Sequence, residues 1–489
     1  KKRGGEKRRK AQRAIASSLA ICLGTFPISA FFSYQITPWS FLANMAILPC
    51  MSLLFIFGCI GSLLAVWQVN AGRFVLSVCS WLVRFFLLIC RMERKLPGGV
   101  LITGRPGWWQ IAAYYVVLGI WLAAAHAGRR TDRTGGGKHI RKRSKKPGRR
   151  KSVSARRAIF LLLFAGGIGI LAFRIHPSFG GVFLDVGQGD CTLIRLYGRN
   201  YLVDCGSSSV ENVWSRRVSP ALKYYGIDRL DGVFVTHGDH DHINGMEELF
   251  DTYERNLLGN NCADVSIDAV YFTSAGDIQG TKALAHIDTD ADKAGRDLFT
   301  DEAAAKLAVK AAGLRIPTRT LMPGDHILVE DPFYRTERRR EDGIICLYPS
   351  RDDIRAARDD ANMKSMVLQV RYGDVILMMM GDLEKEGEER FVRENAGLQG
   401  SSGPGTIHLI LKAGHHGSGN ATSQELLDLL HPETAVVSCG RNNRYGHPAQ
   451  TVLYRLKQAG TRCCRTDTDG AIVIRQHRGT LRCTGWKSG

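Results

Sequence analysis

Six consecutive residues contain five side chains of the kinds that bind metal ions: His237, Asp239, His240, Asp241 and His242. They directly follow an apolar run at residues 233–236, which we expect to form a strand, so the candidate ligands lie at a strand end. Mixed imidazole and carboxylate ligation suits Zn²⁺ or Mn²⁺ better than Mg²⁺. The spacing therefore predicts a transition-metal site rather than a solvated acidic loop.

Two later apolar runs also end in candidate ligands. Asp382 follows residues 375–380, and His415 and His416 follow residues 407–411. Two cations bridged by Asp382 would lower the pKa of a bound water and polarise a phosphoryl oxygen. This is the chemistry that phosphodiester hydrolysis requires, and we expect two divalent ions, Mn²⁺ or Zn²⁺.

The predicted metal ligands are His237, Asp239, Asp241, His242, Asp382 and His415. His416 is the alternative to His415, because neighbouring side chains on an extended chain point apart. Asp204 ends another short apolar run and is expected to orient a ligand histidine rather than to bind metal. Gln188 and Asp190 are as consistent with a turn as with a place in the site.

Asp241 and His447 are the predicted catalytic residues. His447 directly precedes Pro448, a residue type favoured in the first turn of a helix, so its imidazole and the helix N-terminus could bind a phosphate. The alternative is that His447 is an ordinary surface turn residue.

Short apolar segments and helical segments alternate after Pro177, which predicts an α/β layered domain. The expected strands cover residues 182–186, 192–196, 201–203, 233–236, 375–380, 407–411, 434–437 and 471–474. The expected helices cover residues 219–225, 383–395, 423–430 and 448–459. Between residues 251 and 345 only an Ala-rich helix, 302–312, is predicted.

The first third of the chain is far more apolar than the rest. Its long apolar runs contain a single charge, Arg84, and cover residues 14–32, 41–67, 74–90, 111–125 and 158–173. A bilayer core needs ~20 apolar residues per helix, so four or five membrane spans are expected. The pattern excludes a disordered chain and a single soluble domain.

The net charge of +20, from 66 Lys+Arg and 46 Asp+Glu, is concentrated in two segments. Residues 1–10 hold seven basic residues and residues 128–157 hold fourteen, with one acidic residue in each. A uniformly basic nucleic-acid-binding surface is therefore excluded. Basic residues flanking spans favour the cytoplasmic side, which places everything after residue 175 outside the cell.

The basic loop at residues 91–105 opposes this topology, which would invert if residues 74–90 did not cross. We expect residues 128–157 to be a disordered linker near anionic lipid, with a nucleic-acid contact as the alternative.

The segment His237-x-Asp239-x-Asp241-His242 resembles the H-x-H-x-D-H signature of the metallo-β-lactamase superfamily, with Asp in place of the second His. Further matching segments lie at residues 183–190, 203–206, 380–382, 412–418, 444–448 and 465–472. Together they are similar to the extracellular nuclease-like domain of the ComEC family of competence proteins. Residues 42–49 resemble the last part of the channel domain of that family.

This resemblance implies a multi-span α-helical membrane region followed by an α/β metallo-β-lactamase-like domain, an αββα sandwich. It also implies DNA uptake across the cell membrane in natural transformation, with a metal-dependent nuclease degrading the non-transported strand. The implied partners are DNA, membrane lipid and other competence proteins. The expected domains are transmembrane helices at 1–127, a cytoplasmic linker at 128–157, a last span at 158–175 and an extracellular domain at 176–489.

The chain departs from the family pattern in two respects. The superfamily usually supplies a further His between the first motif and the bridging Asp, and here only His286 and His326 stand in that interval. The first external domain of the family is missing, so we expect a fragment of a longer chain. The alternatives are a membrane-anchored metallohydrolase acting on another phosphodiester or ester, and a DNA transporter whose metal domain is catalytically dead.

Eight of the thirteen cysteines lie in the expected external domain: Cys191, Cys205, Cys262, Cys346, Cys439, Cys463, Cys464 and Cys483. An oxidising exterior permits disulfides, but the sequence does not assign pairs. The cysteines of the apolar runs are expected to be small packing residues.

Overall fold

The computed structural model describes residues 2–134, 162, 164–258, 265–273, 302–329, 342–356, 360–398, 407–477 and 480–486. These residues form two compact units, of which the first consists mainly of residues 1–174 and the second mainly of the rest. His286, Cys262 and residues 135–161 of the predicted linker and last span lie outside the described residues.

The first unit is helical. It contains α1 (Lys2–Ser33), α2 (Ser40–Trp67), α3 (Val69–Arg94) and α4 (Trp108–Thr134), and residues 164–172 are also helical. Among the described residues, three helical segments are long and apolar enough to cross a membrane: Arg13–Ser33, Ser40–Trp67 and Val69–Arg94. The apolar part of α4, Trp108–Ala123, is shorter. α4 also continues into the segment that the sequence predicts to be a linker.

Helices α2 and α3 pack along each other as a hairpin joined at Gln68. A Cβ added at Gly72 would lie 2.4 Å from Cβ of Ala65, and one at Gly61 would lie 2.8 Å from Cγ of Leu76. These glycines therefore permit the close helix approach that is typical of packing within a bilayer.

The second unit contains two β-sheets. The eight-stranded sheet has the order β10-β9-β7-β5-β4-β3-β18-β19. Its strands are β3 (Phe179–Phe183), β4 (Thr192–Leu196), β5 (Arg199–Val203), β7 (Gly232–Phe234), β9 (Val270–Thr273), β10 (Thr318–Leu321), β18 (Ile472–His477) and β19 (Thr480–Gly485).

The seven-stranded sheet has the order β11-β12-β13-β14-β15-β16-β17. Its strands are β11 (His326–Leu328), β12 (Gly343–Tyr348), β13 (Val367–Tyr372), β14 (Val375–Met379), β15 (His408–Lys412), β16 (Thr434–Val437) and β17 (Arg462–Arg465). In both sheets a set of parallel strands adjoins antiparallel ones.

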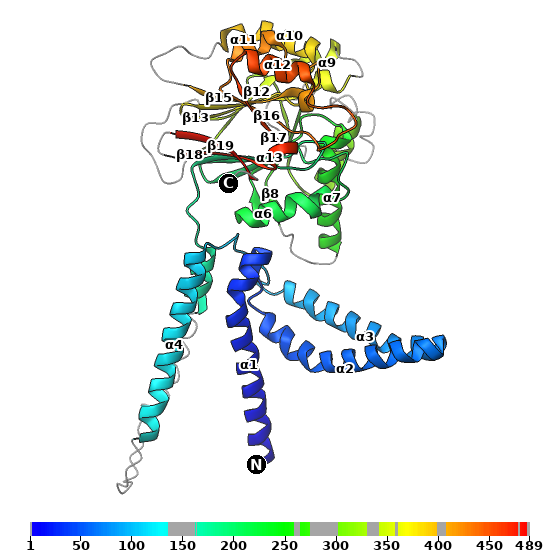
Figure 1. The fold of residues 1–489 in the computed structure, drawn as a ribbon, viewed down its shortest axis with the longest axis vertical. Coiled ribbons are helices and arrows are strands. Elements are labelled where there is room, and N and C mark those ends of the chain that lie inside the picture. The colour runs from blue at the N-terminus through cyan, green and yellow to red at the C-terminus, as the bar shows by residue number, and fades with distance from the viewer. Residues whose placement is uncertain are drawn as a thin grey trace. The chain divides into compact units, whose positions relative to one another are not determined.

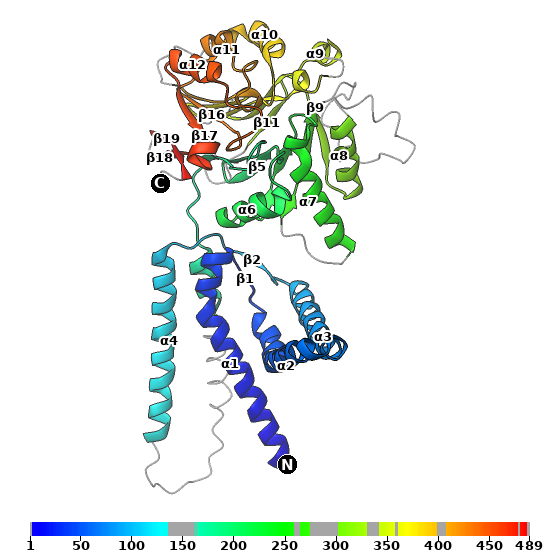
Figure 2. The same cartoon turned by 45° about the vertical axis from the view of Figure 1, so that its right-hand side comes forward.

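Helices cover the outer faces of the two sheets (Figures 1 and 2). Helices α10 (Lys385–Glu394), α11 (Gln424–Leu430) and α12 (Gln450–Gln458) cover the seven-stranded sheet, and α7 (His240–Leu258) and α8 (Glu302–Gly313) lie beside the other. All five residues of β14 are buried, because that strand has the eight-stranded sheet on one face and helices on the other. This layering confirms the predicted α/β fold.

The strand at 192–196 and the helix at 219–225 have the predicted bounds, and the Ala-rich helix is α8. The first strand, β3, ends three residues before the predicted end, because residues 184–190 turn towards the site described below. Strands β9 and β10 were not predicted, since their short runs lie in a polar region and are stabilised by parallel pairing with each other.

Candidate metal centre

Three backbone segments meet at the carboxyl ends of β5 and β7. A Cβ added at Gly189 would lie 2.4 Å from the carbonyl oxygen of Gly206 and 2.6 Å from that of Asp241. A Cβ added at Gly206 would lie 2.3 Å from the carbonyl carbon of Asp241. Only glycine therefore allows the loop before β4, the loop after β5 and the start of α7 to approach so closely. Asp190 and Asp204 are positioned by this contact.

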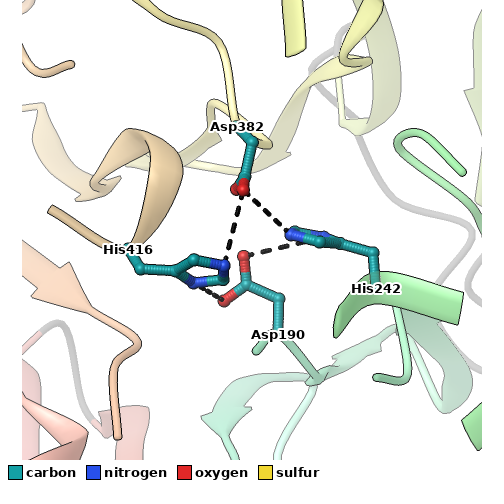
Figure 3. Close-up of side chains that lie close together, drawn as sticks. All are labelled: Asp190, His242, Asp382 and His416. Carbon is teal, nitrogen blue, oxygen red and sulfur yellow. Dashed lines mark ion pairs between the residues drawn. The ribbon is translucent and has the colours of Figure 1, made fainter. Parts of the chain in front are cut away.

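Four buried side chains converge where these segments face the seven-stranded sheet: Asp190, His242, Asp382 and His416. Each offers a ligand atom, and these atoms lie within 4.8 Å of one another (Figure 3). Asp382 Oδ2 lies 3.1 Å from His242 Nε2 and 3.4 Å from His416 Nε2. Asp382 follows β14 and His416 follows β15, so the parallel strands bring both to one sheet edge.

Asp204 orients the ring of His242 through the Nδ1 atom of that ring. Its Oδ2 lies 2.8 Å from His242 Nδ1 and accepts a hydrogen bond of 2.7 Å from the hydroxyl of Thr236, while its Oδ1 accepts one from the Thr236 amide. This leaves His242 Nε2 directed at Asp382. Burial lowers the pKa of His242, but the carboxylates of Asp382 and Asp204 outweigh burial and raise this pKa well above its usual value.

The adjacent residues His415 and His416 both have backbone dihedrals in the left-handed region, with φ of 42° and 54°. Such strain in non-glycine residues is concentrated at functional sites. His416 is buried and its Nδ1 donates to the carbonyl of Ser438, which directs Nε2 into the cluster. His415 is partly exposed, with Nδ1 2.6 Å from Glu384 Oε1 and Nε2 3.8 Å from Asp382 Oδ2. The structure thus places His416 inside the cluster and His415 at its rim.

The remaining predicted ligands surround the cluster. His237 is buried beside His242, with ring centroids 4.1 Å apart, and its Nε2 lies 3.7 Å from Oδ2 of the exposed Asp239. Asp241 Oδ2 lies 3.4 Å from His416 Nε2. Burial raises the pKa of Asp241, but the nearby imidazoles of His416 and His242 outweigh burial and lower the pKa to about 2. Burial lowers the pKa of His237 well below its usual value, which favours the neutral ring that metal binding requires.

Lys412 was not singled out in the sequence, although it is a charged residue ending a buried strand. Its Nζ donates to Asp190 Oδ2 and lies 3.9 Å from Asp382 Oδ1. Lys412 is 2% exposed and Asp190 is 3% exposed. Gln188, the neighbouring candidate, accepts a hydrogen bond from the Gly440 amide and so connects the two halves of the domain.

His447 lies near the cluster but not in it. Its ring centroid is 5.7 Å from that of His415 and it is stacked on Tyr445, whose ring is contacted by Arg444. Helix α12 begins at Gln450, so Pro448 precedes the helix instead of lying in its first turn as predicted. Burial and the neighbouring His415 lower the pKa of His447. His326 stands on the edge strand β11 and is not a member of the four-residue cluster.

The donor set fits metal ions. Among the described residues, several buried site atoms have no hydrogen-bond partner: Nε2 of His237, His242 and His416, and Oδ1 of Asp190 and Asp382. Several carboxylates surround these atoms, and their negative charge exceeds the single positive charge of the buried Lys412 ammonium. Buried charges and polar atoms without partners are costly unless they are paired or coordinate a metal. The residues present therefore have the composition and burial of a divalent-cation site.

Comparison with protein-family models gives two matches. Residues 1–127 match the family described as "Competence protein", and residues 184–254 match the "Metallo-beta-lactamase superfamily". The second match begins directly after β3 and ends within α7, and it contains Asp190, Asp204 and the His237–His242 motif.

Two competence-related proteins are among the curated proteins that the chain resembles. It is 28% identical to "ComE operon protein 3" of Bacillus subtilis (strain 168), over 65% of this chain and 37% of that protein. It is 27% identical to "Competence protein ComA" of Neisseria gonorrhoeae, over 66% of this chain and 36% of that protein. The chain therefore spans little more than a third of the length of these relatives.

Among solved structures, the metallo-beta-lactamase fold protein YhfI from Bacillus subtilis aligns with a TM-score of 0.35 and 12% identity. The alignment covers 60% of this chain and 99% of that chain. A similarity of this size carries no functional inference.

Proposed function

Because this chain joins a competence-protein segment to a metallo-β-lactamase superfamily domain, we propose that it takes part in DNA uptake across the cytoplasmic membrane in natural transformation. In this proposal the second unit lies outside the cell and is a metal-dependent nuclease that degrades the non-transported strand. The observation that carries the nuclease proposal is the buried convergence of Asp190, His242, Asp382 and His416.

Two groups of residues would hold the metal ions. One ion would be held by His242, His416 and Asp241, with the carboxylate of Asp382 facing the same ion. The other ion would be held by His237 and Asp239. Divalent ions in such a site supply an activated water and polarise the phosphoryl oxygen. Mn²⁺ or Zn²⁺ is preferred over Mg²⁺ because imidazole nitrogens form much of the donor set.

Side chains at the rim would bind and orient the phosphodiester. Burial lowers the pKa of His415, but the hydrogen bond with Glu384 and the charge of Asp382 raise it overall, which favours a positively charged ring. A charged His415 would contact a phosphoryl oxygen. His447 lies beside His415, and burial lowers its pKa, which favours a neutral ring that can accept a proton. The exposed Tyr445 beside it offers a ring on which a base can stack.

The helical unit would contribute to a channel for the transported single strand. This part of the proposal is supported by the family match of residues 1–127 and by three helices of membrane-spanning length and composition.

A membrane-anchored hydrolase acting on another phosphodiester is the second candidate function. It is favoured by one observation, that every residue of the site lies within the second compact unit.

The nuclease proposal is tested with the full chain purified in detergent. The protein is exhaustively chelated and then given end-labelled duplex or single-stranded DNA with or without Mn²⁺ or Zn²⁺. We expect cleavage only when metal is added. Full activity after chelation contradicts the proposal, and a metal-loaded but inactive protein favours a transporter with a dead metal domain.

A second experiment separates DNA uptake from simple anchoring. Gly72→Leu introduces a side chain where even a Cβ would lie 2.4 Å from Ala65, and so disrupts the α2–α3 hairpin. Gly58→Leu is the matched control, because nothing lies within 4 Å of a Cβ at that position. We expect Gly72→Leu to abolish transformation while nuclease activity remains. Normal transformation in that variant favours the second candidate function.

A further inference from the structure

Two buried cysteines outside the four-residue cluster face each other where the two sheets meet. The Sγ of Cys483 lies 3.5 Å from the Sγ of Cys464 and donates a hydrogen bond to it. Cys464 lies on β17 and Cys483 lies on β19, strands that are in contact but belong to different sheets. Each strand is the outermost one of its sheet at this edge. A bond between these two sulfurs would therefore connect the two sheets covalently.

The neighbouring thiol, Cys463, does not share this position. Successive side chains of a strand point to opposite faces of the sheet. Cys464 and Cys483 belong to the core between the two sheets, whereas Cys463 packs with the core under the outer helices. Only one member of the Cys463–Cys464 pair can therefore reach Cys483.

We propose that Cys464 and Cys483 are an oxidisable pair whose disulfide fastens the eight-stranded sheet to the seven-stranded sheet. The hydrogen bond from Cys483 lowers the pKa of Cys464 to about 7, against the opposing effect of burial. The same interaction, together with burial, raises the pKa of Cys483. Cys464 is thus the nucleophile, because the thiolate is the reactive form of cysteine.

The oxidant is an external disulfide, such as oxidised glutathione, which gains access when the edge strand β19 opens locally. The Cys464 thiolate attacks one sulfur of this reagent, forming a mixed disulfide and releasing one thiolate. Cys483 then loses its proton and attacks Sγ of Cys464, forming the Cys464–Cys483 bond and releasing the second thiolate. The chain loses two electrons, which reduce the external disulfide to two thiols.

Peptide mapping of the full chain tests the proposal. The protein in detergent is reduced, equilibrated with oxidised glutathione, alkylated with N-ethylmaleimide and digested with trypsin without reduction. We expect the peptide of residues 463–465 to be linked to that of residues 483–487, because trypsin cleaves after Arg462, Arg465 and Arg482. Reduction before digestion should abolish the linked species.

Matched serine variants identify the sulfur involved. Cys463→Ser should retain the link and Cys464→Ser should abolish it, with the metal content unchanged in both as evidence of folding. The oxidised wild type should unfold at a temperature several degrees above that of the reduced protein, since a cross-link restricts the unfolded chain. Cys464→Ser should show no such shift. Alkylation of both Cys464 and Cys483 after oxidation overturns the proposal, and so does a link that persists in Cys464→Ser.

Discussion

Lys412 Nζ donates to the carboxylate of Asp190 in the interior of the domain, where both residues are almost inaccessible to solvent. The two residues are 222 positions apart. Asp190 lies in the loop before β4 of the eight-stranded sheet, and Lys412 ends β15 of the seven-stranded sheet. Asp190 also faces His242, with 3.9 Å between Oδ2 and Nδ1, and His416, with 3.8 Å between Oδ1 and Nδ1. The ion pair therefore holds Asp190 against the cluster, with the ammonium of Lys412 also 3.9 Å from Asp382 Oδ1.

Lys412→Met should destabilise the chelated protein by about 3–5 kcal/mol, because it leaves the Asp190 carboxylate buried without its partner. Denaturant unfolding measures the change. In the double variant Lys412→Met/Asp190→Asn the loss should be clearly smaller than the sum of the two single losses. Additive losses would show that the two side chains are not energetically coupled.

Asp382→Asn should reduce hydrolysis by orders of magnitude while the fold is largely retained. The amide preserves the shape of the side chain but removes the charge that faces His242 and His416. Metal content by mass spectrometry should fall together with the rate. If this variant kept its full metal content and cleaved DNA at a near-normal rate, the assignment of Asp382 to the metal centre would have to be abandoned.

His447→Ala should keep the full metal content and lower turnover or substrate affinity. The reason is that His447 lies beside His415 and outside the four-residue cluster. Steady-state kinetics with a defined oligonucleotide separates kcat from KM. Tyr445→Phe, which retains the stacked ring, is the control and should have a much smaller effect. Loss of bound metal from His447→Ala would assign this histidine to the metal centre instead.

The chelated protein should lose stability as pH rises through the folded-state pKa of His242. Asp382 and Asp204 outweigh burial and raise that pKa. The stabilisation is therefore fully present below the unfolded-state pKa of histidine, about 6.5, and disappears above the raised value. Thermal unfolding of the chelated wild type and of His242→Gln gives the contribution by difference. A difference that grows with pH would have the wrong sign.

Metal binding should also release protons and tighten as pH rises, because the metal must displace the proton from His242. Calorimetric titrations in two buffers of different ionisation enthalpy measure the number of protons released. A pH-independent affinity would contradict a ligand role for this histidine.

A reporter fused after Phe173 should lie outside the cell, and one inserted between Lys138 and Lys151 should lie in the cytoplasm. The reason is the tendency of basic segments to remain inside. Alkaline phosphatase and green fluorescent protein fusions give opposite signals on the two sides. The inverse pattern would show that one of the predicted spans, most simply residues 74–90, does not cross.

Local sequence patterns were sufficient to predict the kind of fold and the place of the site. The strand followed by His237–His242, and the apolar runs before Asp382 and His416, are short-range signals that need no knowledge of distant contacts. Parallel strands then bring their carboxyl ends to one edge, so the general region of the site followed from the order of the elements.

The tertiary structure alone decided which ligands meet. Alternation along an extended chain could not choose between His415 and His416, because both residues adopt left-handed dihedrals, and the carbonyl of Ser438 orients His416.

Asp190 enters the cluster because Gly189 and Gly206 permit backbone contacts that a Cβ would prevent. Its partner Lys412 comes from a strand 222 residues away. Contacts over such separations depend on how the two sheets pack, and this packing has no local signature in the sequence.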